Sequence, residues 1–137
     1  MFARMLSCLL GAMCLMILIS SGCGSGGPPL GEVTGTVTLD GKPLVGASVQ
    51  FDPGNTRPAS GVTDNQGNYK LSFIPGTEGA PVGNNIVRIY PKSSNETGDD
   101  LPESEIVSIP AKYNEESELT AEVTTGANKF DFALESE

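Results

Sequence analysis

The side chains able to do chemistry in this chain are three cysteines and 17 carboxylates, because the sequence contains no histidine. Without histidine there is no His-based catalytic triad, no His-ligated zinc site and no general base that titrates near neutral pH. Eight basic residues give 137 residues a net charge of −9, which argues against nucleic acid as a partner, since lysine and arginine supply most of that affinity. We therefore expect a chain that is not an enzyme and needs no cofactor.

The first 22 residues have the composition of an export signal. Arg4 is the only early charge, and residues 5–19 are uncharged and mostly apolar. At about 1.5 Å per residue this run spans roughly 22 Å, which is short of a bilayer core of about 30 Å. We predict that residues 1–22 are a cleaved signal peptide, with an uncleaved membrane anchor as the alternative.

The end of this segment, residues 19–23 (ISSGC), resembles the bacterial lipoprotein signal, in which small residues precede a lipidated cysteine. The resemblance implies that the thiol of Cys23 takes a diacylglyceryl group and that Cys23 is the first residue of the mature chain. Cys8 and Cys14 would leave with the signal peptide, so the mature chain could form no internal disulfide.

The same resemblance implies where in the cell the mature chain is located. Residues 23–31 are rich in glycine and proline, which predicts a flexible tether. The lipid on Cys23 would attach the domain to a membrane of the cell envelope. Gly24, rather than aspartate, follows the cysteine, and this implies the outer membrane.

Residues 32–137 are predicted to form one domain of short β-strands. Apolar and polar residues alternate with period two between turn residues, and Asp40-Gly41 is typical of a two-residue hairpin. Because each strand has one apolar face, we predict an all-β fold, a two-sheet β-sandwich, with a small barrel as the alternative. Phe51, Leu71, Val87 and Phe132 are expected in its core. The seven predicted strands cover residues 33–39, 47–51, 59–63, 69–73, 86–90, 119–123 and 130–134.

Two segments are candidate calcium sites. Asp99, Asp100, Glu103 and Glu105 lie in a segment without apolar periodicity, which we interpret as a solvated loop, with Ca²⁺ binding as the alternative. In the second segment Asp64, Asn65 and Asn68 surround Gly67, but Gly67 is the fourth residue from Asp64 rather than the sixth, which favours a hairpin turn over a calcium loop.

Residues Lys112, Tyr113 and Asn114 form the remaining candidate site. We interpret this segment as structural: the Tyr113 ring packs at a corner of the domain and its hydroxyl bonds to backbone. Contact with a small ligand or a partner is the alternative.

A series of short motifs follows the chain: Gly35-Thr36-Val37, residues 40–44 (DGKPL), residues 46–49 (GASV), and Thr63-Asp64 with Gly67 and Tyr69. Their order resembles the carboxypeptidase regulatory-like, transthyretin-like domain family over residues 32–134, and residues 109–114 resemble a subgroup of small bacterial lipoproteins with this domain. The resemblance implies a seven-stranded Greek-key sandwich. It implies no activity, because the related hydrolases need histidines and a C-terminal Tyr-Arg-Gly-Ser, and this chain ends Leu-Glu-Ser-Glu.

From these features we predict a non-catalytic cell-envelope lipoprotein whose β-domain is a structural or protein-interaction module. The alternative is a surface module that binds a glycan or calcium, so the partner is an unidentified envelope protein or glycan. An exposed aromatic row or converging carboxylates would favour the alternative. An exposed strand edge would favour the interaction module.

Overall fold

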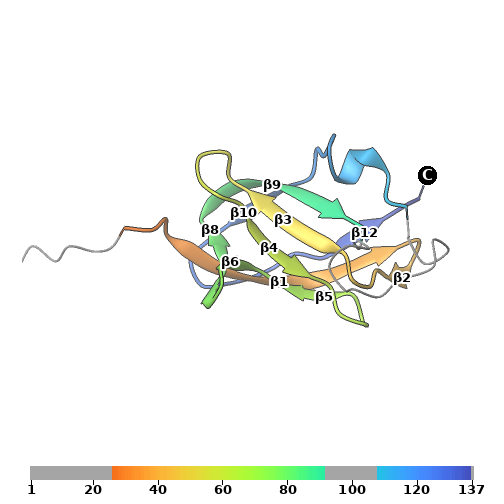
Figure 1. The fold of residues 1–137 in the computed structure, drawn as a ribbon, viewed down its shortest axis with the longest axis horizontal. Coiled ribbons are helices and arrows are strands. Elements are labelled where there is room, and N and C mark those ends of the chain that lie inside the picture. The colour runs from red at the N-terminus through yellow and green to blue at the C-terminus, as the bar shows by residue number, and fades with distance from the viewer. Residues whose placement is uncertain (1–25, 92–107, 137) are drawn as a thin grey trace, which may run out of the picture.

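The computed structural model describes residues 26–91 and 108–136, which form an all-β domain and confirm the predicted fold class (Figure 1). One 3₁₀ helix, η2 (Ala111–Tyr113), lies between β9 and β10 in the chain. The strands in these ranges are β1 (Leu30–Leu39), β2 (Lys42–Pro43), β3 (Ser48–Asp52), β4 (Ala59–Val62), β5 (Asn68–Lys70), β6 (Ser72–Ile74), β7 (Thr77–Glu78), β8 (Ala80–Pro81), β9 (Gly83–Tyr90), β10 (Thr120–Val123), β11 (Ala127–Lys129) and β12 (Phe132–Leu134).

Each of the seven predicted strands has a counterpart, but the number seven is not confirmed, because the described residues contain twelve strands. Several of the additional strands have only two or three residues. β1 begins at Leu30, so the last two residues of the predicted tether, 23–31, pair with Ala80 and Pro81 of β8. β9 begins three residues before its predicted start at residue 86.

The strands form two sheets. The first is centred on β1, which pairs in parallel with β11 and β12 and in antiparallel fashion with β2, β5 and β8. The second has the order β10-β9-β3-β4-β6-β7 and is antiparallel throughout. The hairpin predicted at Asp40-Gly41 joins β1 to β2, and both residues have the positive φ (51° and 78°) that this turn requires.

The predicted strand 69–73 is divided between the two sheets. Its first part, β5, pairs with β1, and its second part, β6, pairs with β4. Leu71 lies between them, fully buried, and its N–H donates to the carbonyl of Val33. The alternating pattern therefore predicts the buried face correctly, but it contains no signal for the change of sheet.

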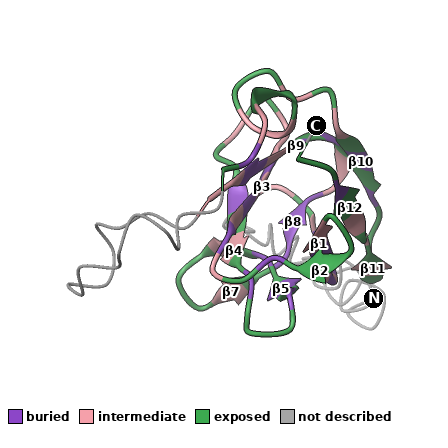
Figure 2. Cartoon of the chain, turned by 90° about the vertical axis from the view of Figure 1, so that its right-hand side faces the viewer, coloured by how far each residue is buried: buried purple, intermediate pink, exposed green. Residues whose placement is uncertain are grey.

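The core lies between the two sheets, where the buried residues gather (Figure 2). Phe51, Leu71 and Val87 are fully buried, as predicted. The prediction for Phe132 was wrong in degree: it is only partly buried. The reason is its place on β12, which pairs with β1 on one side only within the described residues. Its ring still contacts the core, with its centroid 6.3 Å from that of Phe51.

Candidate functional site

Several of the predicted site residues lie outside the described residues. Cys23, the predicted lipidation site, precedes residue 26, and Asp99, Asp100, Glu103 and Glu105 lie between residues 91 and 108. The lipidation and calcium hypotheses for these positions therefore stay predictions.

The segment Lys112, Tyr113 and Asn114 is held by local contacts around η2. The Tyr113 hydroxyl accepts a hydrogen bond from the backbone N–H of Glu135 at 3.1 Å, which confirms the predicted bond to backbone. The Asn114 amide donates to the carbonyl of Ile109 at 3.3 Å, and the Lys112 ammonium lies 5.1 Å from the centroid of the Tyr113 ring. The Tyr113 bond ties the segment to Glu135, just after β12, and the other two contacts lie within residues 109–114. Contact with a ligand there stays a prediction.

Two of the motif residues meet at a close contact between strands. Gly35 of β1 is paired with Tyr69 of β5, and the Tyr69 hydroxyl donates to the carbonyl of Phe130 at 2.6 Å. A Cβ at position 35 would lie 1.8 Å from that carbonyl oxygen and 2.8 Å from the hydroxyl, so only glycine fits. Burial, followed by the charge of Asp131, raises the pKa of Tyr69, so the hydroxyl keeps its proton and stays a donor. This part of the motif serves packing.

The segment that starts at Asp64 is a turn, as predicted, but it does not join two paired strands, because β4 before it pairs with β3 and β6 and β5 after it pairs with β1. One carboxylate oxygen of Asp64 accepts the backbone N–H groups of Gln66 (2.8 Å) and Asn68 (2.9 Å). Thr63, just before it, is buried, and its hydroxyl accepts the N–H of Ala47 at 2.8 Å. Because the carboxylate of Asp64 already serves backbone donors of its own turn, its observed role is structural.

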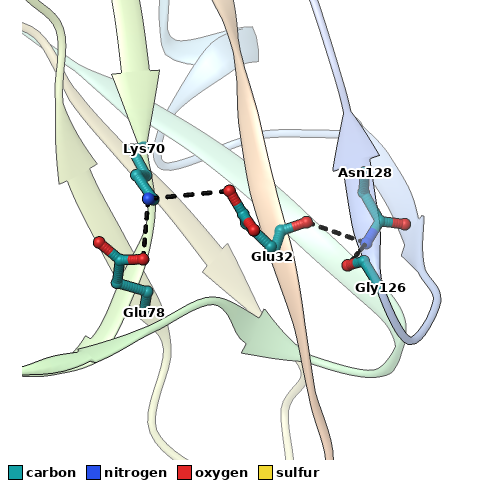
Figure 3. A network of polar contacts seen from close by, with 5 residues as sticks. All are labelled: Glu32, Lys70, Glu78, Gly126 and Asn128. Carbon is teal, nitrogen blue, oxygen red and sulfur yellow. Dashed lines mark hydrogen bonds and ion pairs between the residues drawn. The ribbon is translucent and has the colours of Figure 1, made fainter.

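A polar network links the first sheet to Glu78 of β7, in the second sheet, and joins residues far apart in the sequence (Figure 3). The Lys70 ammonium lies 2.7 Å from a carboxylate oxygen of Glu78 and 3.7 Å from one of Glu32. The hydrogen bond to Glu78, followed by the charges of both glutamates, raises the pKa of Lys70. The amide of Asn128 donates to the carbonyls of Glu32 and Gly126, at 3.0 and 3.1 Å. Since the ionic side chains are about half exposed, we assign these ion pairs a small part in stability.

The surface that the sequence did not point to is the edge of the second sheet at β10. Antiparallel strands direct their backbone groups alternately toward the neighbour and away from it. The carbonyl of Leu119 accepts the N–H of Val87, so residues 119 and 121 face β9, and Thr120 and Glu122 direct their backbone groups away. Within the described residues no strand pairs with that side of β10. The alternating residues of a single strand predict its buried face but not its neighbours in the sheet, so the sequence did not predict this edge.

The features that would favour the glycan or calcium alternative are not found in the described parts of the chain. The large hydrophobic side chains most exposed there are aliphatic: Val45, Val62, Ile74 and Ile86. In the same ranges no three side chains of Asp, Glu, Cys or His converge to hold a metal ion.

No protein-family model, no curated protein and no solved structure matches this chain. Between residues 26 and 91 and between 108 and 136, no helix is long and apolar enough to cross a membrane.

Proposed function

We propose that this chain is a non-catalytic cell-envelope lipoprotein, attached to the outer membrane through lipid on Cys23, whose β-domain is a protein-interaction module. The observation that carries the interaction role is the outer edge of β10, which no strand of the described residues pairs with, because a strand with free backbone groups can accept a strand from a partner. The lack of histidine in the whole sequence supports a role without acid–base or zinc chemistry.

The lipid anchor rests on the amino-acid sequence. Small residues precede Cys23, and a Gly/Pro-rich segment follows it. Each buried CH₂ of an acyl chain contributes about 0.8 kcal/mol to membrane binding, and two or more chains hold a protein stably. The protein surface cannot replace the acyl chains in membrane binding, because a chain with a net charge of −9 is repelled by anionic lipid.

The finer fold assignment is part of the same proposal. The domain is a seven-stranded Greek-key sandwich of the transthyretin-like type, to which the shortest strands of the structure are additions. The shared core of the two sheets supports this, as does the contact of Gly35 with Tyr69, which gives two of the family-like motif residues a common structural purpose. An experimental structure of the domain, with its strand order traced, tests the assignment.

The anchor is tested by detergent phase partitioning of the full-length chain, expressed in a bacterium that processes lipoproteins. We expect the wild type in the detergent phase with Cys23 as its acylated first residue, and Cys23→Ser in the aqueous phase or retained with its signal uncleaved. Cys14→Ser is the matched control. It also replaces a cysteine thiol by a hydroxyl, but at a position inside the predicted signal peptide, so the partitioning of the protein should not change. A wild-type N-terminus at Met1 by mass analysis would mean that residues 5–19 are an anchor and that the lipoprotein assignment is wrong.

The interaction role is tested separately, by chemical crosslinking in intact cells followed by mass spectrometry. Reproducible crosslinks from the domain to other envelope proteins are expected. A domain that crosslinks to no protein and is retained on an immobilised glycan would move the assignment to the alternative module.

A further inference from the structure

Within the described residues the outer backbone side of β10 is unpaired, and this four-residue strand lacks several of the usual edge protections. Natural sheets block their edges with proline, lysine, bulges or charges that point inward. β10 has the sequence Thr-Ala-Glu-Val, with no proline and no lysine, and its register with β9 is regular. Its inward side chains, Ala121 and Val123, are apolar and buried, so an added strand would meet no buried charge.

The other edges in the described chain are less suited to a partner strand. β7, at the opposite end of the same sheet, has two residues. The edge formed by β11 and β12 is interrupted at Phe130 and Asp131, where a side-chain oxygen of Asp131 replaces the backbone in accepting the N–H of Thr36. The edge that β2, β5 and β8 form beside β1 consists of strands of two or three residues. With four residues, β10 is therefore the longest uninterrupted edge strand of the two sheets in those ranges.

The solvent side of this edge is acidic. Glu122 lies within β10 and Glu118 two residues before it, both exposed, and Glu115 and Glu116 precede them. Within the described ranges neither Glu118 nor Glu122 forms an ion pair, and the cation of the next strand, Arg88, pairs with Asp52 at 2.8 Å on its far side. The carboxylates beside the open backbone groups are thus available to an incoming positive charge.

A second copy of this chain fits the edge poorly. Two β10 edges brought together would align Glu118 and Glu122 with the same glutamates of the other copy, and like charges across a strand pair are destabilising. The net charge of −9 adds long-range repulsion between copies. The charge favours a partner of opposite sign.

We propose that β10 binds an extended, lysine- or arginine-bearing segment of another protein by strand addition. The partner's backbone pairs with the outward N–H and C=O groups of Thr120 and Glu122. Lysine or arginine side chains on one face of the partner strand lie opposite Glu118 and Glu122. Since residues four apart on a strand are about 13 Å apart, the two glutamates match cations that are also four residues apart. The inference rests on the interaction role proposed above and names the chemistry of its partner.

The test measures binding of labelled peptides to the full-length chain in detergent micelles by fluorescence anisotropy. The probe is a peptide of about ten residues in which lysine alternates with threonine and valine. One control peptide has the same composition with the lysines grouped at one end, and a second carries N-methyl groups on the alternate amides that would face β10. N-methylation removes the backbone donors and leaves the charge unchanged, so it separates strand addition from simple charge attraction.

Three protein variants accompany the wild type. Glu118→Lys combined with Glu122→Lys reverses the charge at the edge. Thr120→Pro removes an outward N–H and leaves the ladder with β9 intact, as proline permits on an edge strand. Glu78→Lys is the control for a charge reversal elsewhere: it lies on β7, at the opposite edge of the sheet, and changes the net charge by two units, half the change of the double variant.

We expect the alternating peptide to bind wild type at least about tenfold more tightly than the N-methylated peptide, with affinity falling at high salt. A cross-strand ion pair is worth up to about fivefold in affinity and two pairs up to about 25-fold. Because the double reversal also adds like-charge repulsion, it should cost about tenfold. Thr120→Pro should weaken binding comparably, and Glu78→Lys should stay within about twofold of wild type. Circular dichroism checks that each variant is folded. If Thr120→Pro does not fold, the comparison of the alternating and N-methylated peptides on the wild type still tests the proposal.

Equal binding of the alternating and N-methylated peptides would overturn strand addition, and so would equal losses in the Glu78→Lys and double-reversal variants. Absence of peptide binding would also overturn it. If the domain then still crosslinks to envelope proteins in cells, the interaction role stands and only its assignment to β10 fails. A dimer of wild type that the double reversal dissociates would show that a second copy occupies the edge.

Discussion

Removal of the Tyr69 hydroxyl tests the contact that joins β5 to the C-terminal strands. In Tyr69→Phe the carbonyl of Phe130 loses its hydrogen bond, and within the described residues no other donor reaches this oxygen. A net hydrogen bond contributes about 0.5–1.5 kcal/mol, and an acceptor left buried and unpaired costs about 1–3 kcal/mol. Tyr69 is only 4% exposed, so water does not readily take the place of the hydroxyl. We expect a loss of about 2 kcal/mol in the free energy of unfolding.

Urea denaturation at pH 7 measures this loss. For a domain of this size the free energy of unfolding falls by about 1–3 kcal/mol per molar urea, so the midpoint should decrease by about 1 M. Tyr90→Phe is the matched control, because no described residue hydrogen-bonds the Tyr90 hydroxyl, and a change within about 0.5 kcal/mol is expected. Equal, small losses in the two variants would refute the role assigned to the contact between Tyr69 and Phe130.

The pH dependence supplies a second test of the same hydroxyl. Burial raises the pKa of Tyr69 in the folded state above the usual tyrosine value of 10.0. The folded form therefore holds this proton over a range in which the unfolded chain releases it, so stability falls as pH rises above 10. The loss approaches about 1.4 kcal/mol per pH unit, and Tyr69→Phe should lack it. Parallel stability profiles for wild type and variant between pH 9 and about pH 11.5 would contradict a raised pKa.

The remaining predictions concern the core and metal binding. Gly35→Ala should destabilise by about 3 kcal/mol or prevent folding, because its Cβ would lie 1.8 Å from a backbone oxygen; a neutral effect in thermal melting would contradict the register of β1. Phe132→Ala should cost about 2 kcal/mol in urea unfolding, below the 3–5 kcal/mol of a fully buried aromatic, because Phe132 is only partly buried. Asn85→Asp would place a carboxyl against the carbonyls of Pro81 and Gly83; a raised pKa should make it less destabilising at pH 4 than at pH 7, and equal losses at the two pH values would contradict its burial. Purified protein should retain no stoichiometric zinc in metal analysis after dialysis, and a Ca²⁺-dependent rise in melting temperature would revive the calcium alternative.

The alternating pattern and the turn residues predict much of the local structure. Asp40-Gly41 and the turn at Asp64 form where expected, since each depends on backbone preferences and hydrogen bonds within a few residues. Phe51 and Val87 are buried as predicted, because alternation places them on the same side as the other apolar residues of their strands.

Other features depend on which strands become neighbours. The all-β class, the turns and most of the buried faces can be predicted from the amino-acid sequence, because they follow from interactions between residues close in the chain. Three features depend on the assembled fold: strand 69–73 changes sheet at Leu71, Phe132 lies at an edge, and β10 is the last strand of its sheet within the described residues. These outcomes are set by contacts between distant segments, such as Tyr69 with Phe130, 61 residues apart, and no local pattern specifies them.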